Sequence, residues 1–160
     1  MTHYMELLAT NQPWNLIIFM AIPVILAEYI AVSELYILFT RNKKSIITLL
    51  NKIASIVVGV YFSGVFVYLM KNAVIPITTN GEWRGPADVI AVGFYLAGVI
   101  PLVGMALLEA GAFPKVTGDN MLKLHAVFVG VFLVVAHIAM IFGMLNPELL
   151  GGSVGMKEAM

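Results

Sequence analysis

Four long apolar blocks, separated by short polar segments, make up most of the chain. They run from about residue 14 to 39, 46 to 70, 89 to 113 and 121 to 145, and the second could equally start at Ile53. Each can cross a hydrocarbon core of ~30 Å as a helix that rises about 1.5 Å per residue. None alternates apolar and polar positions as a membrane barrel strand does. The pattern predicts one all-α domain, a bundle of four transmembrane helices, with a flexible tail over 146–160.

Composition agrees with this class. Of 160 residues, 61% are hydrophobic and 11% are charged, against about 45–50% and about 25% in soluble domains. The formal net charge of zero gives no support to a nucleic-acid partner. The chain has no cysteine, which excludes disulfides, thiolate metal sites and thiol nucleophiles.

The basic residues of the connections predict the orientation. Five of them stand between the first and second or the third and fourth blocks: Arg41, Lys43, Lys44, Lys115 and Lys123. The other side has Lys71, Arg84 and Lys157. Because Lys and Arg of short loops mark the cytoplasmic side, we expect a multi-pass protein of the inner (cytoplasmic) membrane with both termini outside. Trp14 and Trp83 then lie at the outer interface, where indoles are common.

The segments on that outer side carry local signals of their own. Residues 1–14 begin with a capping Thr2 and predict a short interfacial helix that ends at Pro13. Gly81, Gly85 and Pro86 predict a turn near Trp83.

Two acids, Glu28 and Glu34, interrupt the first apolar block. A carboxylate at bilayer depth costs roughly 2.5–3.5 kcal/mol on insertion scales. At the helix rise, Glu28 lies ~21 Å inward from Trp14 and Glu34 ~30 Å, near the cytoplasmic boundary. Six residues turn a helix by about 600°, so the two acids face different directions. They do not form a carboxylate pair, and Glu28 is expected to be the deeper acid.

Other polar residues share the inner layer with these acids. Glu109 stands near the inner end of the third block, His125 about one turn into the fourth, and Asn51 and Lys52 near the start of the second. If their faces converge with Glu28 or Glu34, the cluster could hold a proton relay, a quinone headgroup or a hard cation. The alternative is that these groups are interfacial, snorkelling or salt-bridged.

The fourth block, "LHAVFVGVFLVVAHIAMIFGM", carries two histidines. His125 and His137 are 12 residues apart, which is ~18 Å along a helix and about 120° around it, so they cannot bind one ion. Gly130 lies seven residues before His137, only about 20° from its face. A histidine with a bare patch beneath it suits a porphyrin ring, and it equally suits close helix packing.

This pattern resembles the small four-helix b-type membrane cytochromes, in which one helix carries two histidines toward opposite leaflets with a glycine between them. The resemblance covers His125 to His137 and the four-span size. It implies haem b clamped by histidines from two helices. That family has four histidines, whereas this chain has three at a shorter spacing. One chain could thus complete one such haem at most, with His137 and His3 as ligands, or His137 and a methionine. A haem on His125 would need a different ligand or a second subunit.

Two other interpretations of the fourth block stay open. His137, Met140 and Met144 share one helix face, and imidazole with thioethers suits Cu(I). This spacing resembles the copper-uptake channels, although their methionine-rich outer segments are missing here beyond Met1 and Met5. Alternatively, the histidine is a structural tie that hydrogen-bonds a neighbouring helix.

These observations favour a membrane-embedded haem b protein that passes electrons between a quinone or small oxidant and an outer partner. His137 is an axial ligand in this hypothesis, His3 or His125 is a second candidate, Gly130 makes room for the ring, and acids such as Glu28, Glu34 and Glu109 manage protons. The alternative is a small proton- or cation-coupled permease, a homo-oligomer since four spans seldom enclose a pathway. A structural or accessory subunit is the third option. Pro23 and Pro101 predict kinks that open the bundle.

Overall fold

The computed structural model describes residues 2–41 and 45–146, and these residues form helices without a strand. Four helical spans are long and apolar enough to cross a membrane, at Trp14–Thr40, Ile46–Asn80, Pro86–Glu109 and Asp119–Met144. The prediction of an all-α, four-span membrane protein is confirmed. The predicted tail over 146–160 lies outside the described residues except for Asn146.

Three of the spans are segmented. The first consists of α2 (Trp14–Leu16), the π-helix η1 (Ile17–Ala21) and α3 (Ile22–Thr40). The second consists of α4 (Ile46–Leu69), the π-helix η2 (Met70–Val74) and α5 (Ile75–Asn80). The third consists of α6 (Pro86–Ala97) and α7 (Val99–Glu109), and the fourth is α8 (Asp119–Met144). A short helix α1 (His3–Ala9) precedes them, capped by Thr2 as predicted.

Two spans differ from the predicted ranges. The second continues ten residues beyond Met70, because its polar residues lie within the π-helix η2 instead of ending the helix. The third ends at Glu109 instead of Phe113. There Gly111 adopts a left-handed φ of 80°, and Ala112 N–H donates back to the Leu107 carbonyl at 3.0 Å. This pairing satisfies the terminal carbonyls of α7 and stops the helix.

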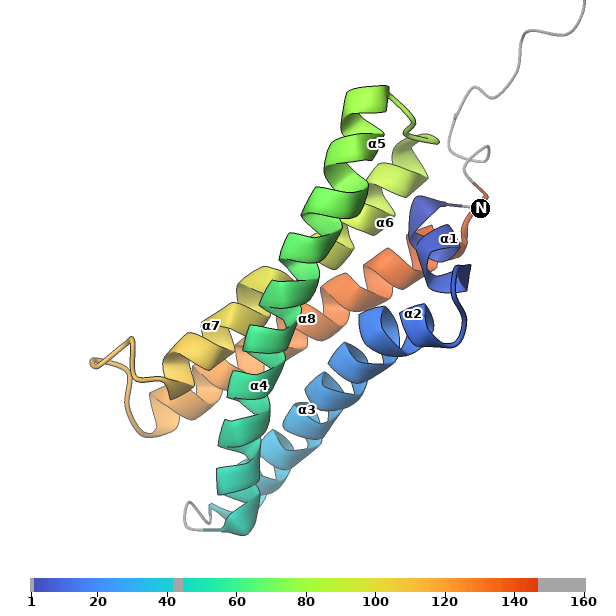
Figure 1. The fold of residues 1–160 in the computed structure, drawn as a ribbon. Helices are drawn as coiled ribbons and strands as arrows, with labels where there is room; N and C mark the ends of the chain where they lie inside the picture. The colour runs from blue at the N-terminus through green and yellow to red at the C-terminus, as the bar shows by residue number, and fades with distance from the viewer. Residues whose placement is uncertain (1, 42–44, 147–160) are drawn as a thin grey trace, which may run out of the picture.

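The spans pack as an antiparallel bundle (Figure 1). α4 contacts α7 and α3, while α8 contacts α6, α7 and α3. We name the two ends of this bundle by their content. At the basic end α3 and α7 finish and α4 and α8 begin, near Arg41, Lys115 and Lys123. At the α1 end, α1 lies beside the start of α6 and the end of α8 (Figure 1).

A close helix approach through Gly59 holds α4 against α7. A Cβ at this position would lie 2.5 Å from Ala106 Cβ and 2.7 Å from the Leu102 carbonyl oxygen. Buried Phe62 and Met105 flank the contact. Small residues at such crossings increase dispersion contacts between helices, which is the main packing force once a chain is in lipid.

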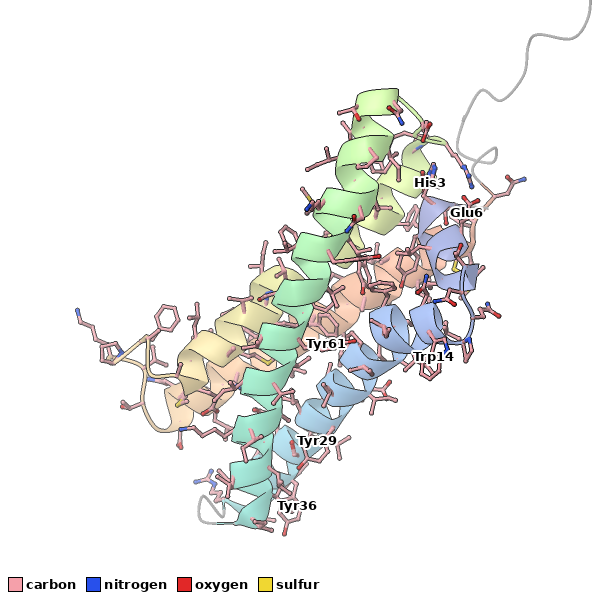
Figure 2. All side chains as sticks on the ribbon, viewed as in Figure 1. His3, Glu6, Trp14, Tyr29, Tyr36 and Tyr61 are labelled. Carbon is pink, nitrogen blue, oxygen red and sulfur yellow. The ribbon has the colours of Figure 1, made fainter. Side chains whose placement is uncertain are left out.

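Each segmented span contains an Ile-Pro step, at Pro23, Pro76 and Pro101. Proline has no backbone N–H, so the carbonyl four residues earlier loses its helical partner. For Pro23 that carbonyl is on Phe19, and the Tyr95 hydroxyl donates to it. One residue before it, the Ile18 carbonyl accepts from the Tyr61 hydroxyl at 2.8 Å (Figure 2). Neighbouring spans thus satisfy backbone groups that lipid could not.

Helix α1 is docked onto the bundle instead of lying free at an interface. The Thr2 hydroxyl donates to the Gly143 carbonyl at 2.6 Å, and the Tyr4 ring packs against Gly143, where a Cβ would lie 2.7 Å from that ring. Burial raises the pKa of the Tyr4 phenol to about 12. Glu6 forms an exposed ion pair with Arg84, at 2.5 Å, near His3 (Figure 2).

The Gly59 contact yields a matched pair of substitutions. Gly59→Ala should destabilise the bundle by about 1–3 kcal/mol, because its Cβ overlaps backbone that cannot move aside cheaply. Gly64→Ala, also on α4, should be neutral or stabilising, since no atom lies within 4 Å of its Cβ and alanine favours helix. Unfolding in mixed detergent micelles, followed by circular dichroism, measures both. Equal effects of the two substitutions would contradict the close α4–α7 approach.

Candidate functional site

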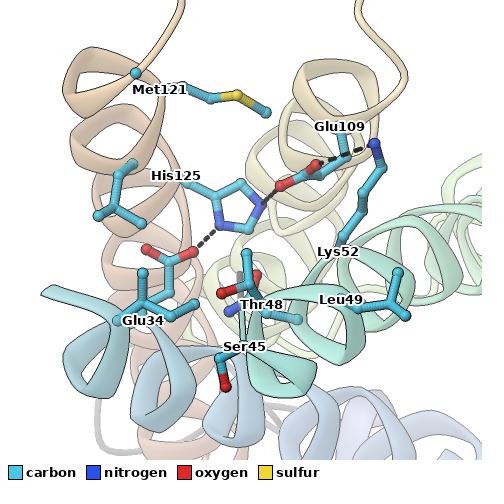
Figure 3. Close-up of a pocket in the computed structure, with 12 residues that line it drawn as sticks. Glu34, Ser45, Thr48, Leu49, Lys52, Glu109, Met121 and His125 are labelled. Atoms are coloured by element: carbon cyan, nitrogen blue, oxygen red, sulfur yellow. Dashed lines mark hydrogen bonds and ion pairs between the residues drawn. The ribbon is translucent and has the colours of Figure 1, made fainter. Parts of the chain in front are cut away.

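A buried acid–imidazole pair lies at the basic end of the bundle. Glu34, on the penultimate turn of α3, directs Oε1 at Nδ1 of His125, on the second turn of α8 (Figure 3). The two side chains are only 3% and 2% exposed. Because an ionised group is costly to bury alone, each is retained here by the other.

The pair extends to two further charged groups. On the other side of the imidazole, Nε2 of His125 lies 3.7 Å from Oε1 of Glu109, at the end of α7. Oε2 of Glu109 in turn lies 4.0 Å from Nζ of Lys52 on α4, whose side chain is 51% exposed. All four spans therefore contribute one member to a chain Glu34–His125–Glu109–Lys52, which leads from a buried carboxylate to an exposed ammonium (Figure 3).

This chain lines a cavity of about 490 Å³. Polar groups of the α4 start, on Ser45, Thr48 and Asn51, share the lining with it. Two of its buried atoms, Oε2 of Glu34 and Nε2 of His125, have no hydrogen-bond partner among the described residues. Buried polar atoms without a partner are rare, because each costs about 1–3 kcal/mol, and they recur where a protein binds or transfers something.

Hydrogen bonds between α3 and α4 fix the position of Glu34. The Asn51 amide donates to Ser33 Oγ at 2.7 Å and to the Ile30 carbonyl at 3.4 Å, and all three groups are buried. The Ser55 hydroxyl donates to the Asn51 carbonyl at 2.8 Å, within α4. Ser33 directly precedes Glu34, so this tie sets the depth and rotation at which the carboxylate meets His125.

The charge balance of this chain depends on one proton. With both glutamates ionised, Lys52 charged and His125 neutral, the four groups sum to −1, and a proton on His125 brings the sum to zero. An imidazole can receive a proton at one nitrogen and release one from the other. The carboxylates lie against opposite nitrogens of the ring, so they do not converge on one ion. Among the residues that the structure describes, no group of three metal-ligating side chains is found.

The structure places the two acids of α3 in different surroundings. Glu34 is the buried acid, whereas Glu28, expected to be the deeper functional group, is exposed on the side of the bundle. Glu28 does not join the cluster of Glu34, Glu109 and His125. It lines a second cavity, of about 250 Å³, together with His137 and Met140. Met144, expected on the same face for copper, is 64% exposed.

His3 has a different partner from the one the haem hypothesis requires. Its Nδ1 lies 2.5 Å from Oδ2 of Asp88, and its backbone N–H donates to Oδ1 at 2.7 Å. Asp88, in the first turn of α6, is completely buried and also accepts from the Arg84 backbone N–H at 3.4 Å. This acid anchors α1 to the bundle. His3 lines a third cavity, which His137 does not share.

The three histidines thus occupy three separate places, and a bis-histidine haem within one chain does not fit them. His125 lies between two carboxylates and His3 against Asp88. His137 bonds only its own helix among the described residues, Nδ1 to the Leu133 carbonyl at 2.6 Å. Gly130 does face open space, because a Cβ added there would have no atom within 4 Å. The haem b hypothesis stays a prediction that rests on His137.

Sequence reasoning missed three polar residues on which this arrangement depends. Ser33 is adjacent to Glu34 in the sequence, and a small polar residue beside a buried acid was the available signal. Asp88 stands at a helix start, where acids are common because they interact favourably with the helix dipole, so its contact with His3 could not be recognised from the sequence. No sequence signal marks Tyr95. Its hydroxyl donates to the Phe19 carbonyl, which Pro23 leaves without a helical donor, and this contact between two spans cannot be recognised from either segment alone.

The chain belongs to a protein family, since a family model covers residues 1–159; its description is "Family of unknown function (DUF6803)". No curated protein and no solved structure gives a significant match. The family therefore adds no activity to what the geometry supports.

A double-mutant cycle tests the buried pair. We expect Glu34→Gln and His125→Asn each to destabilise the protein, because each leaves a buried polar partner behind. Their combination should be less harmful than the sum, with a coupling of about 0.5–3 kcal/mol. Glu28→Gln with His125→Asn is the matched control and should be additive within about 0.5 kcal/mol. Chemical unfolding in micelles gives all the values; additivity in both cycles would refute the Glu34–His125 contact.

Proposed function

We propose that this protein is a small proton- or cation-coupled permease, or a subunit of one, in which the Glu34–His125–Glu109 chain takes up and releases the coupling proton. The single observation that carries the proposal is His125 itself, a buried imidazole with a glutamate against each ring nitrogen. Intramembrane ionisable groups of this kind mark proton relays and substrate pathways in transporters.

The charge balance of the chain is what would couple proton release to the binding of a cationic solute. The chain is neutral with a proton on His125 and carries a charge of −1 without it. A cationic solute in the adjoining cavity could replace this proton, because it restores neutrality while the imidazole is uncharged. The unpartnered Oε2 of Glu34 and Nε2 of His125 are two hydrogen-bond acceptors for such a solute when His125 is neutral. Proton and solute would then compete for one site.

The setting of the cavity agrees with this role. It lies at the basic end, which we assign to the cytoplasmic side of an inner membrane by the positive-inside rule. The half-exposed Lys52 connects the chain to that side. Four spans seldom enclose a complete pathway, so we assign a homo-oligomer whose subunits line it together.

Haem b electron transfer is the alternative. It is favoured by one observation, the exposed His137 above the open space at Gly130. The second axial ligand would come from a methionine or another subunit.

Proton flux in liposomes tests the permease. Protein is reconstituted with a trapped pH-sensitive dye, and an inward concentration gradient of each member of a panel of small ammonium ions and amines is imposed. We expect proton movement above that of protein-free liposomes for at least one solute of the panel. Glu34→Gln and His125→Asn should each lower it at least tenfold, because either change removes a link of the chain.

Glu82→Gln is the control, since Glu82 is an exposed acid of the 81–85 turn and lies outside the cavity. It should leave the flux unchanged. Infrared spectra of the same samples give an independent reading, a carboxylate stretching band of Glu34 that shifts when His125 gains or loses its proton and that is lost in Glu34→Gln. Flux equal to that of protein-free liposomes with the whole panel, together with a band insensitive to pH, would reject the proposal.

The visible spectrum of protein expressed with added haem precursor tests the alternative. A stoichiometric Soret band that disappears in His137→Ala and persists in His125→Asn would favour haem b electron transfer. The permease proposal expects a colourless preparation.

A further inference from the structure

The second cavity opens on the side of the bundle between α3 and α8. The spans that contain these helices are the least covered of the four, with 28% and 22% of their most apolar windows buried, against 39% in each of the others. Glu28 of α3 and His137 of α8 both line this cavity, and both are exposed. We refer to it below as the lateral groove.

Both polar side chains of the lateral groove lack a tertiary partner. Among the described residues Glu28 has no hydrogen bond or ion pair, and His137 contacts only the Leu133 carbonyl of its own helix. Glu28 stands about midway along its span and His137 about two turns from the end of α8. Ionisable groups at this depth are costly and normally face a partner, a ligand or a water-filled cavity. The structure leaves this pair open toward lipid.

The remaining lining defines what fits between them. It is aromatic and apolar, with the rings of Phe19, Tyr95 and Phe132 and the thioethers of Met20 and Met140. Within the described ranges neither lysine nor arginine lines the groove, so a phosphate or carboxylate headgroup would meet Glu28 without a compensating cation. A neutral flat ring with polar atoms at opposite ends meets each of these conditions.

The spacing of the two polar groups agrees with such a ring. In the antiparallel pair of helices Glu34 faces His125, so the level of Glu28, six residues back on α3, corresponds to Val131 on α8. His137 lies six residues further, which is about 9 Å along the helix. A six-membered ring with para oxygens spans this distance when each oxygen forms a hydrogen bond of about 2.8 Å.

We propose that the lateral groove binds the headgroup of a membrane-soluble quinone or quinol, with its oxygens on His137 and Glu28 and its isoprenoid tail in the lipid. Because Nδ1–H of His137 donates to the Leu133 carbonyl, Nε2 of the neutral ring accepts from a quinol hydroxyl, and it donates to a quinone oxygen when the ring is protonated. A protonated Glu28 can donate to the other oxygen, and an ionised Glu28 can accept from a quinol hydroxyl. The site is separate from the Glu34–His125 chain and is independent of the permease proposal.

Binding of a short-tailed benzoquinone and a naphthoquinone to protein in lipid nanodiscs tests this site. Calorimetry should show saturable binding with one quinone per chain. His137→Ala and Glu28→Gln should each weaken it at least tenfold, because each removes one of the two oxygen contacts. A photoreactive azidoquinone should label peptides of α3 and α8.

Three controls make the test specific. Ile141→Ala lies one turn beyond His137 on an exposed position of α8, and Glu82→Gln changes an exposed acid that does not line the groove; both should leave quinone binding unchanged. Thermal unfolding shows whether each variant is folded. We expect the Glu28 and His137 variants to fold, because both side chains are exposed.

Other occupants of the groove give different results. If a fatty acid or phospholipid displaces the quinone stoichiometrically, the groove is a lipid site and the proposal is overturned. If His137→Ala and Glu28→Gln change the oligomeric state and leave quinone affinity intact, the groove is a contact between copies of this chain, and the proposal is likewise overturned. Absence of saturable binding to the unmodified protein refutes it directly.

Discussion

The burial of one carboxylate against one imidazole is the constraint on which the rest of the structure depends. Glu34 and His125 come from the first and last spans, and neither tolerates the apolar interior without the other. Their contact sets the register of α3 against α8. The Asn51–Ser33 bond sets α4 against α3 at the same depth, and Glu109 brings the end of α7 to the imidazole. One ionisable cluster thus fixes the relative positions of all four spans at the basic end.

Away from the basic end, contacts between spans satisfy backbone groups instead of ionisable side chains. The Ile-Pro steps free backbone carbonyls inside the spans, and lipid offers them no donor. The hydroxyls of Tyr95 and Tyr61 reach the first span from the third and second and satisfy the freed Phe19 and Ile18 carbonyls. Irregular backbone is therefore stable only in the assembled bundle. The π-helix η1 and Pro23 lie where Phe19 and Met20 line the lateral groove.

The sequence predicted the elements well and their partners poorly, for a physical reason. Long apolar runs are a local property, so the four spans, the Thr2 cap and the turn near Trp83 could be recognised from single segments. The positions of Glu34 and Glu28 along the first span follow from the helix rise alone. The position along a span does not show which neighbouring helix a side chain faces. The cluster of Glu34, Lys52, Glu109 and His125 could therefore only be stated beside the alternative that these groups are interfacial; the structure brings the four together. His3 shows the same limit, because Asp88, a residue 85 positions away, decides its role.

The two acids of α3 illustrate how one helix can serve two environments. Six residues separate Glu34 from Glu28, and the resulting rotation turns one toward the bundle interior and the other toward the side. In the interior the carboxylate of Glu34 is stabilised by fixed partners from other spans. On the side, no residue that the structure describes compensates Glu28. The aromatic groove beside Glu28, with His137 at its other end, fits a flat uncharged molecule better than an anionic lipid, because neither lysine nor arginine lines it among the described residues. The same helix that carries the buried Glu34 therefore also forms one wall of the lateral groove.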